Sequence, residues 1–305
     1  MRISRRDFLK VAGVGGAIFM MGPGNLAGAA DGQSKRDDFF FVQMSDTHWG
    51  FNDPKINPDS QGTLKKAIAY VNSLETQPDF IVFTGDLTHN TEDPKERRKR
   101  MAEFRDIISG LKVKNIRFLP GEHDASFDKG EAFQEFFGKT HYIFDHKGVH
   151  FIAIDNVSEK TSTIGDAQLQ WLSEILMPLD KESPIVVLTH RPLFDLFPKW
   201  DWWTQDGARA MELLMPFRNV VVLYGHIHQE NQHVAGHIPL YATRGLMYPL
   251  PAPASLPKRI QLPWDPADPY KGMGFRSVEA KAGKTGNPEY QLTQYSVINK
   301  GGGYR

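Results

Sequence analysis

Residues 79–86 read DFIVFTGD, an apolar run that stops abruptly at a glycine and an aspartate. The run follows neither the period of 2 that marks a half-buried strand nor the period of 3.6 that marks an amphipathic helix. A short run of this kind predicts a strand that is buried on both faces. The same pattern returns five times along the chain, at residues 39–42, 115–119, 149–154, 184–189 and 219–224.

Helical patterns separate these predicted strands, in segments 63–74, 94–111, 131–137, 166–177 and 207–217. Strand–helix alternation on this scale predicts an α/β domain with largely parallel strands. The tail differs, because residues 249–269 hold seven prolines and predict an irregular surface segment. Two alternating segments follow, residues 275–280 and 290–297, and they predict a closing antiparallel hairpin.

The composition limits the chemistry that this chain can perform. Its 305 residues, 40% of them apolar, are enough for one large domain or two small ones, and no linker divides them convincingly. The 36 basic and 36 acidic residues balance, which argues against a disordered chain and against a generic nucleic-acid binder. The absence of cysteine excludes disulfides, thiol nucleophiles and thiolate metal sites. Any metal must therefore be held by histidine or by oxygen ligands, which directs attention to the 11 histidines.

The first thirty residues have the pattern of an export signal. A positively charged start precedes an apolar, glycine-rich stretch at residues 11–22 and the small-residue run Ala27-Gly28-Ala29. The start itself, SRRDFLK at residues 4–10, resembles the bacterial twin-arginine signal at every position. We therefore expect a signal peptide at residues 1–29 and a mature domain at residues 30–305.

The resemblance implies passage through the twin-arginine translocase and a periplasmic or extracellular location. The apolar stretch is too short to span a bilayer, so we expect no stable membrane anchor. Cleavage after Ala29 would remove four basic residues and one acidic residue, which changes the net charge from 0 to −3.

Polar residues follow the predicted strands at the point where each strand ends. In open α/β sheets these carboxyl ends form the ligand crevice, so segments far apart in the chain can converge there. His and Asp at positions i and i+2 of an extended end point the same way, as two ligands of one metal must. The groups are Asp46-Thr47-His48, Gly85-Asp86, Gly121-Glu122-His123-Asp124, Thr189-His190 and Gly225-His226-Ile227-His228. Four histidines and three carboxylates are too many donors for one tetrahedral ion and suit two ions that share a carboxylate.

This ordered set of motifs resembles the calcineurin-like metallophosphoesterase superfamily over nearly all of the mature chain. The resemblance implies a layered sandwich of two mixed, largely parallel β-sheets flanked by helices. It also implies that Asp46, His48 and His228 bind a first metal ion. His190, His226 and Glu122 would bind the second ion, with Asp86 as the bridge. His123, oriented by Asp124, would be the general acid.

The implied reaction is hydrolysis of a small-molecule phosphate ester. Two cations about 3.5–4 Å apart lower the pKa of a bridging water, so that a hydroxide attacks phosphorus at neutral pH. His123 would then protonate the departing alkoxide, and Asp124 would fix its tautomer. We expect iron or manganese as the metals, with zinc as an alternative.

Glu122 departs from the family pattern, which has asparagine at this position. Three carboxylates against two divalent ions leave a charge of +1 before hydroxide, whereas asparagine would leave +2. Glu122 is thus expected to weaken attraction for a dianionic monoester and to favour a more highly charged ion such as Fe(III). Three outcomes are open: a working phosphoesterase, with diesters as the candidate substrates; a retuned centre with redox or other chemistry; or a metal-binding protein that catalyses little.

Other residues bear on the substrate. Purple acid phosphatases have a metal-binding tyrosine three residues after the bridging aspartate, whereas this chain has His89, which disfavours that subtype. His89 could approach the metals or the substrate, or be a solvated loop residue. Trp202 and Trp203 could form a stacking wall above the site, or a cluster that covers a helix. Arg244 could reach an anionic group of the substrate. A metal-carrier protein would not need the His123–Asp124 pair, and one basic helix gives little support for nucleic-acid binding.

Overall fold

Two β-sheets form the centre of the computed structural model, which describes residues 38–159, 161–283 and 288–297. The signal peptide predicted at residues 1–29 lies outside the described residues. The first sheet has the strand order β11-β10-β1-β2-β3. Its strands are β1 (Phe39–Met44), β2 (Phe80–Thr84), β3 (Ile116–Leu119), β10 (Gly274–Ala282) and β11 (Pro288–Ser296). The strands β1, β2 and β3 are parallel, and the predicted closing hairpin β10–β11 pairs antiparallel with β1.

The second sheet has the strand order β4-β5-β6-β7-β9-β8. Its strands are β4 (Tyr142–His146), β5 (Val149–Ala153), β6 (Pro184–Leu188), β7 (Asn219–Tyr224), β8 (Asn231–Ala235) and β9 (Ile238–Ala242). The four inner strands β5, β6, β7 and β9 are parallel, and an antiparallel strand closes each edge. The predicted fold of two mixed, largely parallel sheets is therefore confirmed.

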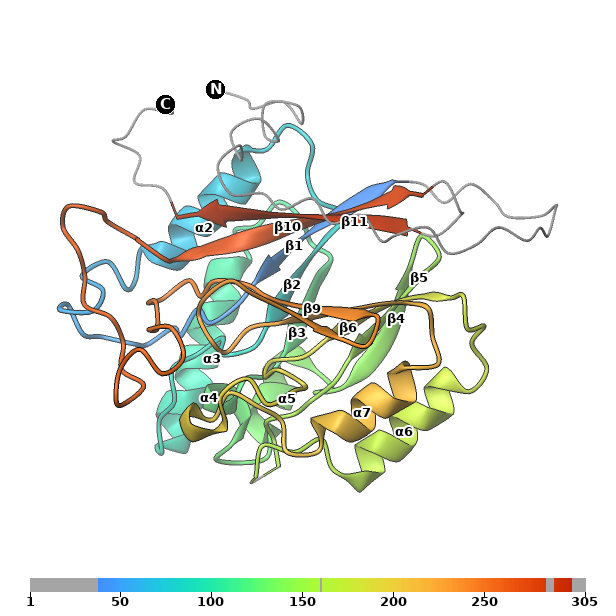
Figure 1. The fold of residues 1–305 in the computed structure, drawn as a ribbon. Coiled ribbons are helices and arrows are strands. Elements are labelled where there is room, and N and C mark those ends of the chain that lie inside the picture. The colour runs from blue at the N-terminus through green and yellow to red at the C-terminus, as the bar shows by residue number, and fades with distance from the viewer. Residues whose placement is uncertain (1–37, 160, 284–287, 298–305) are drawn as a thin grey trace.

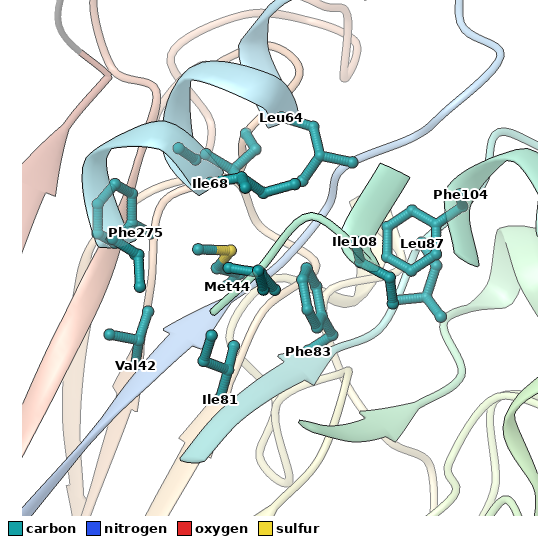
Figure 2. Close-up of a cluster of buried hydrophobic side chains, with 14 of the residues drawn as sticks. Val42, Met44, Leu64, Ile68, Ile81, Phe83, Leu87, Phe104, Ile108 and Phe275 are labelled. Atoms are coloured by element: carbon teal, nitrogen blue, oxygen red, sulfur yellow. The ribbon is translucent and has the colours of Figure 1, made fainter. Parts of the chain in front are cut away.

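Helices cover the two outer faces of this sandwich (Figure 1). The helices are α2 (Thr63–Ser73), α3 (Pro94–Ile108), α4 (Glu122–Ala125), α5 (Glu131–Phe137), α6 (Asp166–Leu176) and α7 (Gly207–Leu214), with a 3₁₀ turn at Pro198–Trp200. Figure 2 shows Leu64 and Ile68 of α2 and Phe104 of α3 above Met44 and Phe83 of the first sheet. The helices α6 and α7 pack in the same way on the second sheet.

The two sheets face each other across a third apolar cluster, in which aromatic rings dominate. Phe41 and Phe80 stack with centroids 4.8 Å apart, and Phe151 of the second sheet meets both rings edge-on at 5.5 and 5.2 Å. These three side chains are fully buried. Because both faces of each central strand are covered, the strands read as continuous apolar runs rather than as alternating patterns.

Helix ends agree with the local chemistry of the sequence. The carboxylate of Asp93 accepts the backbone N–H of Lys95 at 2.9 Å, and Pro94 occupies the first helical position of α3. In α2 the buried residues Leu64, Ala67, Ile68 and Val71 recur at helical spacing. The carboxyl ends of β1, β2, β3, β6 and β7 then bring the predicted metal ligands to one edge of the sandwich.

Candidate metal centre

The predicted ligands lie in the loops that follow five strands, and their backbone is unusual. Positive φ angles occur at Asp46 (54°), His48 (38°), Asp86 (49°), His226 (65°) and His228 (53°). Left-handed backbone is disfavoured for residues other than glycine and persists only where the surrounding structure imposes it. Five of the seven predicted ligands therefore sit on strained turns at the sheet edge.

Two glycines permit the close approach of these turns. Gly85 has φ 96°, and a Cβ atom there would lie 2.2 Å from Nδ1 of His190. A Cβ atom on Gly121 would lie 2.1 Å from Oδ1 of Asp86. Both positions thus require glycine, because any larger residue would overlap a predicted ligand.

The first group of donors consists of Asp46, His48 and His228, whose ligand atoms all lie within 4.8 Å of one another. Nε2 of His48 and Nε2 of His228 are 3.1 Å apart, and Nε2 of His228 is 3.2 Å from Oδ1 of Asp46. All three residues are buried. The structure thus brings together the set predicted for the first ion.

The second group consists of Asp86, Glu122, His190 and His226, again within 4.8 Å. Nε2 of His190 lies 2.8 Å from Oε2 of Glu122, and Nδ1 of His226 lies 3.0 Å from Oε1 of Glu122. Oδ2 of Asp86 is 3.5 Å from Nε2 of His190 and also 3.5 Å from Nε2 of His48. Asp86 therefore stands between the two groups, where a bridging carboxylate is expected.

Backbone carbonyls orient three of the imidazole rings. His190 Nδ1 is 2.7 Å from the carbonyl oxygen of Thr84, and His228 Nδ1 is 2.6 Å from that of Tyr248. His226 is turned the other way, with Nε2 at 3.0 Å from the carbonyl oxygen of Asp201. Since a carbonyl oxygen can only accept, the ring nitrogen beside it carries a proton, and the opposite nitrogen, which faces the carboxylates, is the one that has a lone pair for a cation when the ring is neutral.

The unpaired atoms of the second group fit a metal. Among the described residues, Oε2 of Glu122, Nε2 of His190 and Nδ1 of His226 are buried and have no hydrogen-bond partner, although they lie close together. Buried polar atoms without partners cost free energy. Donor atoms that approach so closely without hydrogen-bond geometry are arranged as ligands around a shared centre. The residues present thus suit two cations held by nitrogen and oxygen.

The buried groups of the centre also shift one another's ionisation. Burial holds the pKa of His48 well below its ordinary value, and the neighbouring His123 and His228 add to this effect. Burial alone would lower the pKa of His190, but Asp86 and Glu122 raise it well above its ordinary value. Burial alone would raise the pKa of Glu122, but His226 and Arg191 bring it well below. Glu122 is therefore a carboxylate anion in the metal-free chain.

His123 lies beside the two groups, as predicted, but Asp124 does not orient it. Nε2 of His123 is 3.9 Å from Oδ2 of Asp86, and its Nδ1 accepts the backbone N–H of Asn90 at 3.1 Å. The carboxylate of Asp124 instead accepts the backbone N–H groups of Leu87 (2.9 Å), Thr88 (2.9 Å) and Gly121 (3.0 Å). Successive residues of a helical turn such as α4 point in different directions, so the two side chains diverge. The predicted role of Asp124 is therefore corrected: it fastens the loops after β2 and β3 to each other.

A cavity of about 220 Å³ opens at the donors. Sequence reasoning missed four residues that line it: Tyr248, Leu250, Arg259 and Gln261. The ring of Tyr248 stacks on His228 (4.6 Å) and His48 (5.0 Å), and its hydroxyl lies 3.3 Å from Nε2 of His48. The proline-rich segment is irregular, as predicted, but it covers the metal centre as well as forming surface. The proximity of this segment to His228 in the sequence was the available signal.

The four residues predicted to contact substrate lie in different environments in the structure. Trp202 is fully buried and packs edge-on against Trp200 at 5.2 Å, so it belongs to the core of the second sheet and is unavailable for stacking on a ligand. Arg244 pairs with Glu230 at 2.6 Å, and neither it nor Trp203 is among the described residues that line the 220 Å³ cavity. His89 does approach the centre, with its Nδ1 3.5 Å from Nδ1 of His48.

A second cavity, of about 500 Å³, adjoins this region. Arg259 lines both cavities, and Asp201, whose carbonyl holds His226, lines the second. The second cavity is also lined by Phe197, Trp200, Lys199 and Lys258. Trp200 thus takes the position at a cavity wall that was predicted for Trp202 and Trp203.

Among the described residues, no helix is long and apolar enough to cross a membrane.

Comparison with known proteins agrees with this geometry. A family model described as calcineurin-like phosphoesterase matches residues 41–230, a stretch that contains all seven predicted ligands. A probable cyclic nucleotide phosphodiesterase of Rhodopseudomonas palustris is 25% identical over 228 residues, which cover 68% of this chain and 78% of that protein. A probable glycerophosphodiester phosphodiesterase of Arcobacter nitrofigilis is 25% identical over 206 residues, which cover 62% of this chain and 71% of that protein. The structure of a dimetal phosphatase from Danio rerio is similar in fold, with a TM-score of 0.56, 12% identity, and coverage of 85% of this chain and 98% of that one.

Proposed function

The chain belongs to the calcineurin-like phosphoesterase family, and on that premise we propose that it hydrolyses phosphodiesters outside the cytoplasm. As a member of this family it is a metal-dependent phosphoesterase. The observation that carries the proposal is the convergence of seven nitrogen and oxygen donors, from both sheets, on two adjoining groups that share Asp86.

Two features favour diesters over monoesters as substrates. Glu122 adds a third carboxylate to the centre, which reduces the attraction for a dianion more than for a singly charged diester. A diester carries two organic groups, and the metal cavity shares Arg259 with a second and larger cavity that has aromatic and basic walls. The two relatives described above, which are named as probable phosphodiesterases, add support for this substrate class.

The chain's own residues take separate parts in the proposed reaction. The two donor groups would hold two cations, which, when bound, activate water and neutralise charge on the phosphoryl group. The N–H of Asn90 donates to Nδ1 of His123, so the neutral ring carries its proton on Nε2, toward Asp86. From there the Nε2–H of His123 can donate a hydrogen bond to the departing ester oxygen and stabilise its negative charge, while the proton that this oxygen takes up comes from the attacking water. Arg259 and Gln261, at the wall of the cavity, are placed to bind the oxygens of the substrate.

Turnover of two matched chromogenic substrates tests the proposal. The protein loaded with Mn²⁺ or Fe should hydrolyse bis-p-nitrophenyl phosphate with a higher kcat/KM than p-nitrophenyl phosphate. Asp86→Asn is the control for metal-dependent turnover, because it weakens the shared ligand with little change of shape. A metal-loaded protein that is inert toward the diester, or that prefers the monoester, would refute the diester assignment.

The metals are proposed to be iron or manganese. The three carboxylates provide hard oxygen donors, and the four histidines provide donors of intermediate softness. Metal analysis of protein purified after passage through its native export route identifies the ions. Zinc alone at two equivalents would contradict this assignment.

The extracytoplasmic location rests on residues 4–10, SRRDFLK, whose pattern resembles the twin-arginine signal. Fractionation of cells that express the full chain should place the mature protein outside the cytoplasm. Replacement of both Arg5 and Arg6 by lysine should retain it inside. Unchanged export of that variant would exclude the twin-arginine route.

A further inference from the structure

Arg191 is a buried cation next to the centre, directly after the predicted ligand His190. Its side chain is 5% exposed, and its Nη2 lies 3.6 Å from Oε2 of Glu122. Its Nη1 donates to Asp201, at 2.6 Å to Oδ2 and 2.8 Å to the backbone carbonyl oxygen. That carbonyl also accepts from Nε2 of His226. The guanidinium of Arg191 therefore contacts Glu122 directly and is linked to His226 through the carbonyl of Asp201. Both Glu122 and His226 belong to the second donor group.

The positive charge of Arg191 offsets the negative charge that Glu122 adds to the centre. Three carboxylates against two divalent cations leave a net charge of +1, and the adjacent guanidinium raises this to +2. Asp201 offsets part of that charge, but its carboxylate is 46% exposed, so water screens it far more than it screens Arg191. Interactions between buried charges separated by a few ångströms remain strong in the protein interior.

We propose that Arg191 is the charge partner of Glu122 and restores part of the attraction of the loaded centre for phosphate, while the uncompensated part of the Glu122 charge still disfavours a dianion. Arg191 does not line the 220 Å³ cavity, so its action on phosphate is electrostatic and it is a positioning residue rather than a catalytic one. The inference deepens the proposed function but requires only that the centre binds a phosphate group, whichever ester is hydrolysed.

This role makes a prediction that a merely structural role does not. Removal of a cation beside the centre should strengthen the binding of metal cations and weaken the binding of phosphate anions. A residue that only holds the loop in place would, on removal, weaken both. The two affinities must therefore move in opposite directions if Arg191 acts through its charge.

The experiment measures Mn²⁺ affinity by competition with a chromophoric chelator, and inorganic phosphate affinity of the Mn²⁺-loaded protein by calorimetry. In Arg191→Met we expect Mn²⁺ to bind about tenfold more tightly and phosphate about tenfold more weakly. Arg191→Lys keeps the charge but loses the planar fork, and both affinities should stay within about threefold of the wild type. Glu122→Gln should shift both affinities the other way, with weaker Mn²⁺ and tighter phosphate binding.

Arg97→Met is the matched control. Arg97 is equally buried and pairs with Asp128 at 2.8 Å and with the carbonyl of Thr91, but it lies on α3 and does not line the 220 Å³ cavity. Its loss should lower stability and leave both affinities unchanged.

A parallel fall of both affinities in Arg191→Met, or an unchanged phosphate affinity, would overturn the proposal. If Arg191→Met does not fold, Arg191→Lys and Glu122→Gln decide: unchanged phosphate affinity in Glu122→Gln refutes the charge pair. Because phosphate binding is measured without turnover, failure of the phosphodiesterase assignment would be seen separately.

Discussion

His123 and Asp124 are neighbours in the chain, yet their side chains serve different parts of the molecule. His123 points to the cavity and is held by the N–H of Asn90. Asp124 is buried among backbone donors from two loops, and burial together with the nearby Asp86 raises its pKa to about 6 despite those hydrogen bonds. Substitution at the two positions should therefore have different consequences.

For His123→Ala we expect kcat for the diester to fall about 10²–10³-fold, because the departing ester oxygen loses the N–H that stabilises its negative charge. Metal content and melting temperature should stay close to those of the wild type.

For Asp124→Asn the amide group must face at least one backbone N–H, which costs about 1–3 kcal/mol in the free energy of unfolding for each donor left unpaired. Urea denaturation measures this loss. An Asp124→Asn variant with full stability but no turnover would show that Asp124 does act through His123.

Gly121 offers a second test at single-residue scale. In Gly121→Ala the new methyl group would meet Oδ1 of Asp86 at 2.1 Å, so the bridging carboxylate must move. We expect loss of bound metal, measured by elemental analysis, with a lower melting temperature. Gly110→Ala is the control, because its methyl group would meet a single atom, the Ile107 carbonyl oxygen, at 3.2 Å. Normal metal content in Gly121→Ala would mean that Asp86 is not a required ligand.

At the scale of strands and helices, the sequence predicted what depends on burial and periodicity. The run at residues 80–84 is a strand because both its faces are covered, and Glu131–Phe137 is a helix within the predicted bounds. Proline-rich segments that form neither a strand nor a helix were beyond this reasoning. Arg259 and Gln261 lie in an irregular, proline-rich stretch whose path over the cavity is set by tertiary contacts. The burial of Trp202 could not be predicted for the same reason, because a cluster of tryptophans in the sequence is compatible with a core as well as with a cavity wall.

Asp79 lies where β1, β2 and the β4–β5 turn meet, and it should make the free energy of unfolding depend on pH. The carboxylate of Asp79 accepts the N–H of Phe40 (3.2 Å) and contacts Lys147 (2.8 Å) and His146 (3.2 Å). Burial alone would raise the pKa of Asp79, but the bonds from Lys147 and Phe40 outweigh burial and lower it. The carboxylate therefore adds stability above its unfolded-state pKa of about 3.9, and this is lost as pH falls through the lower folded-state value.

Comparison of wild type with Asp79→Asn measures this contribution. The difference between their free energies of unfolding, from urea denaturation, should be large at pH 6 and should shrink below pH 4. Asp268→Asn, which removes an exposed carboxylate 3.6 Å from Lys271, provides the surface control. A difference that is constant from pH 6 to pH 3 would contradict the role given to Asp79.

At the scale of the whole molecule, the centre lies across the seam between the sheets. Asp46, Asp86 and Glu122 follow strands of the first sheet, whereas His190, His226 and His228 follow strands of the second. Packing between the sheets therefore sets the separation of the donors. Phe151 is the second-sheet ring that contacts both Phe41 and Phe80 at this interface.

For Phe151→Ala we expect a loss of about 3–5 kcal/mol in the free energy of unfolding, and weaker Mn²⁺ binding although no ligand is changed. Ile143→Ala, on the exposed edge strand β4, is the control and should alter neither quantity by much. Mn²⁺ affinity that survives in a folded Phe151→Ala variant would show that the donors are held by their own loops, independently of the packing between sheets.

The division of the donors between two sheets also fixes the order of events during synthesis. When a ribosome has produced the chain as far as Glu122, the carboxylates and His48 exist, but three of the four imidazoles do not. Two-ion occupancy must wait until His228 has emerged, and the Tyr248 carbonyl that orients its ring comes later still. Metal loading is thus a closing step of biogenesis, and a translation product truncated before residue 226 should leave the ribosome without a complete binding site for either ion.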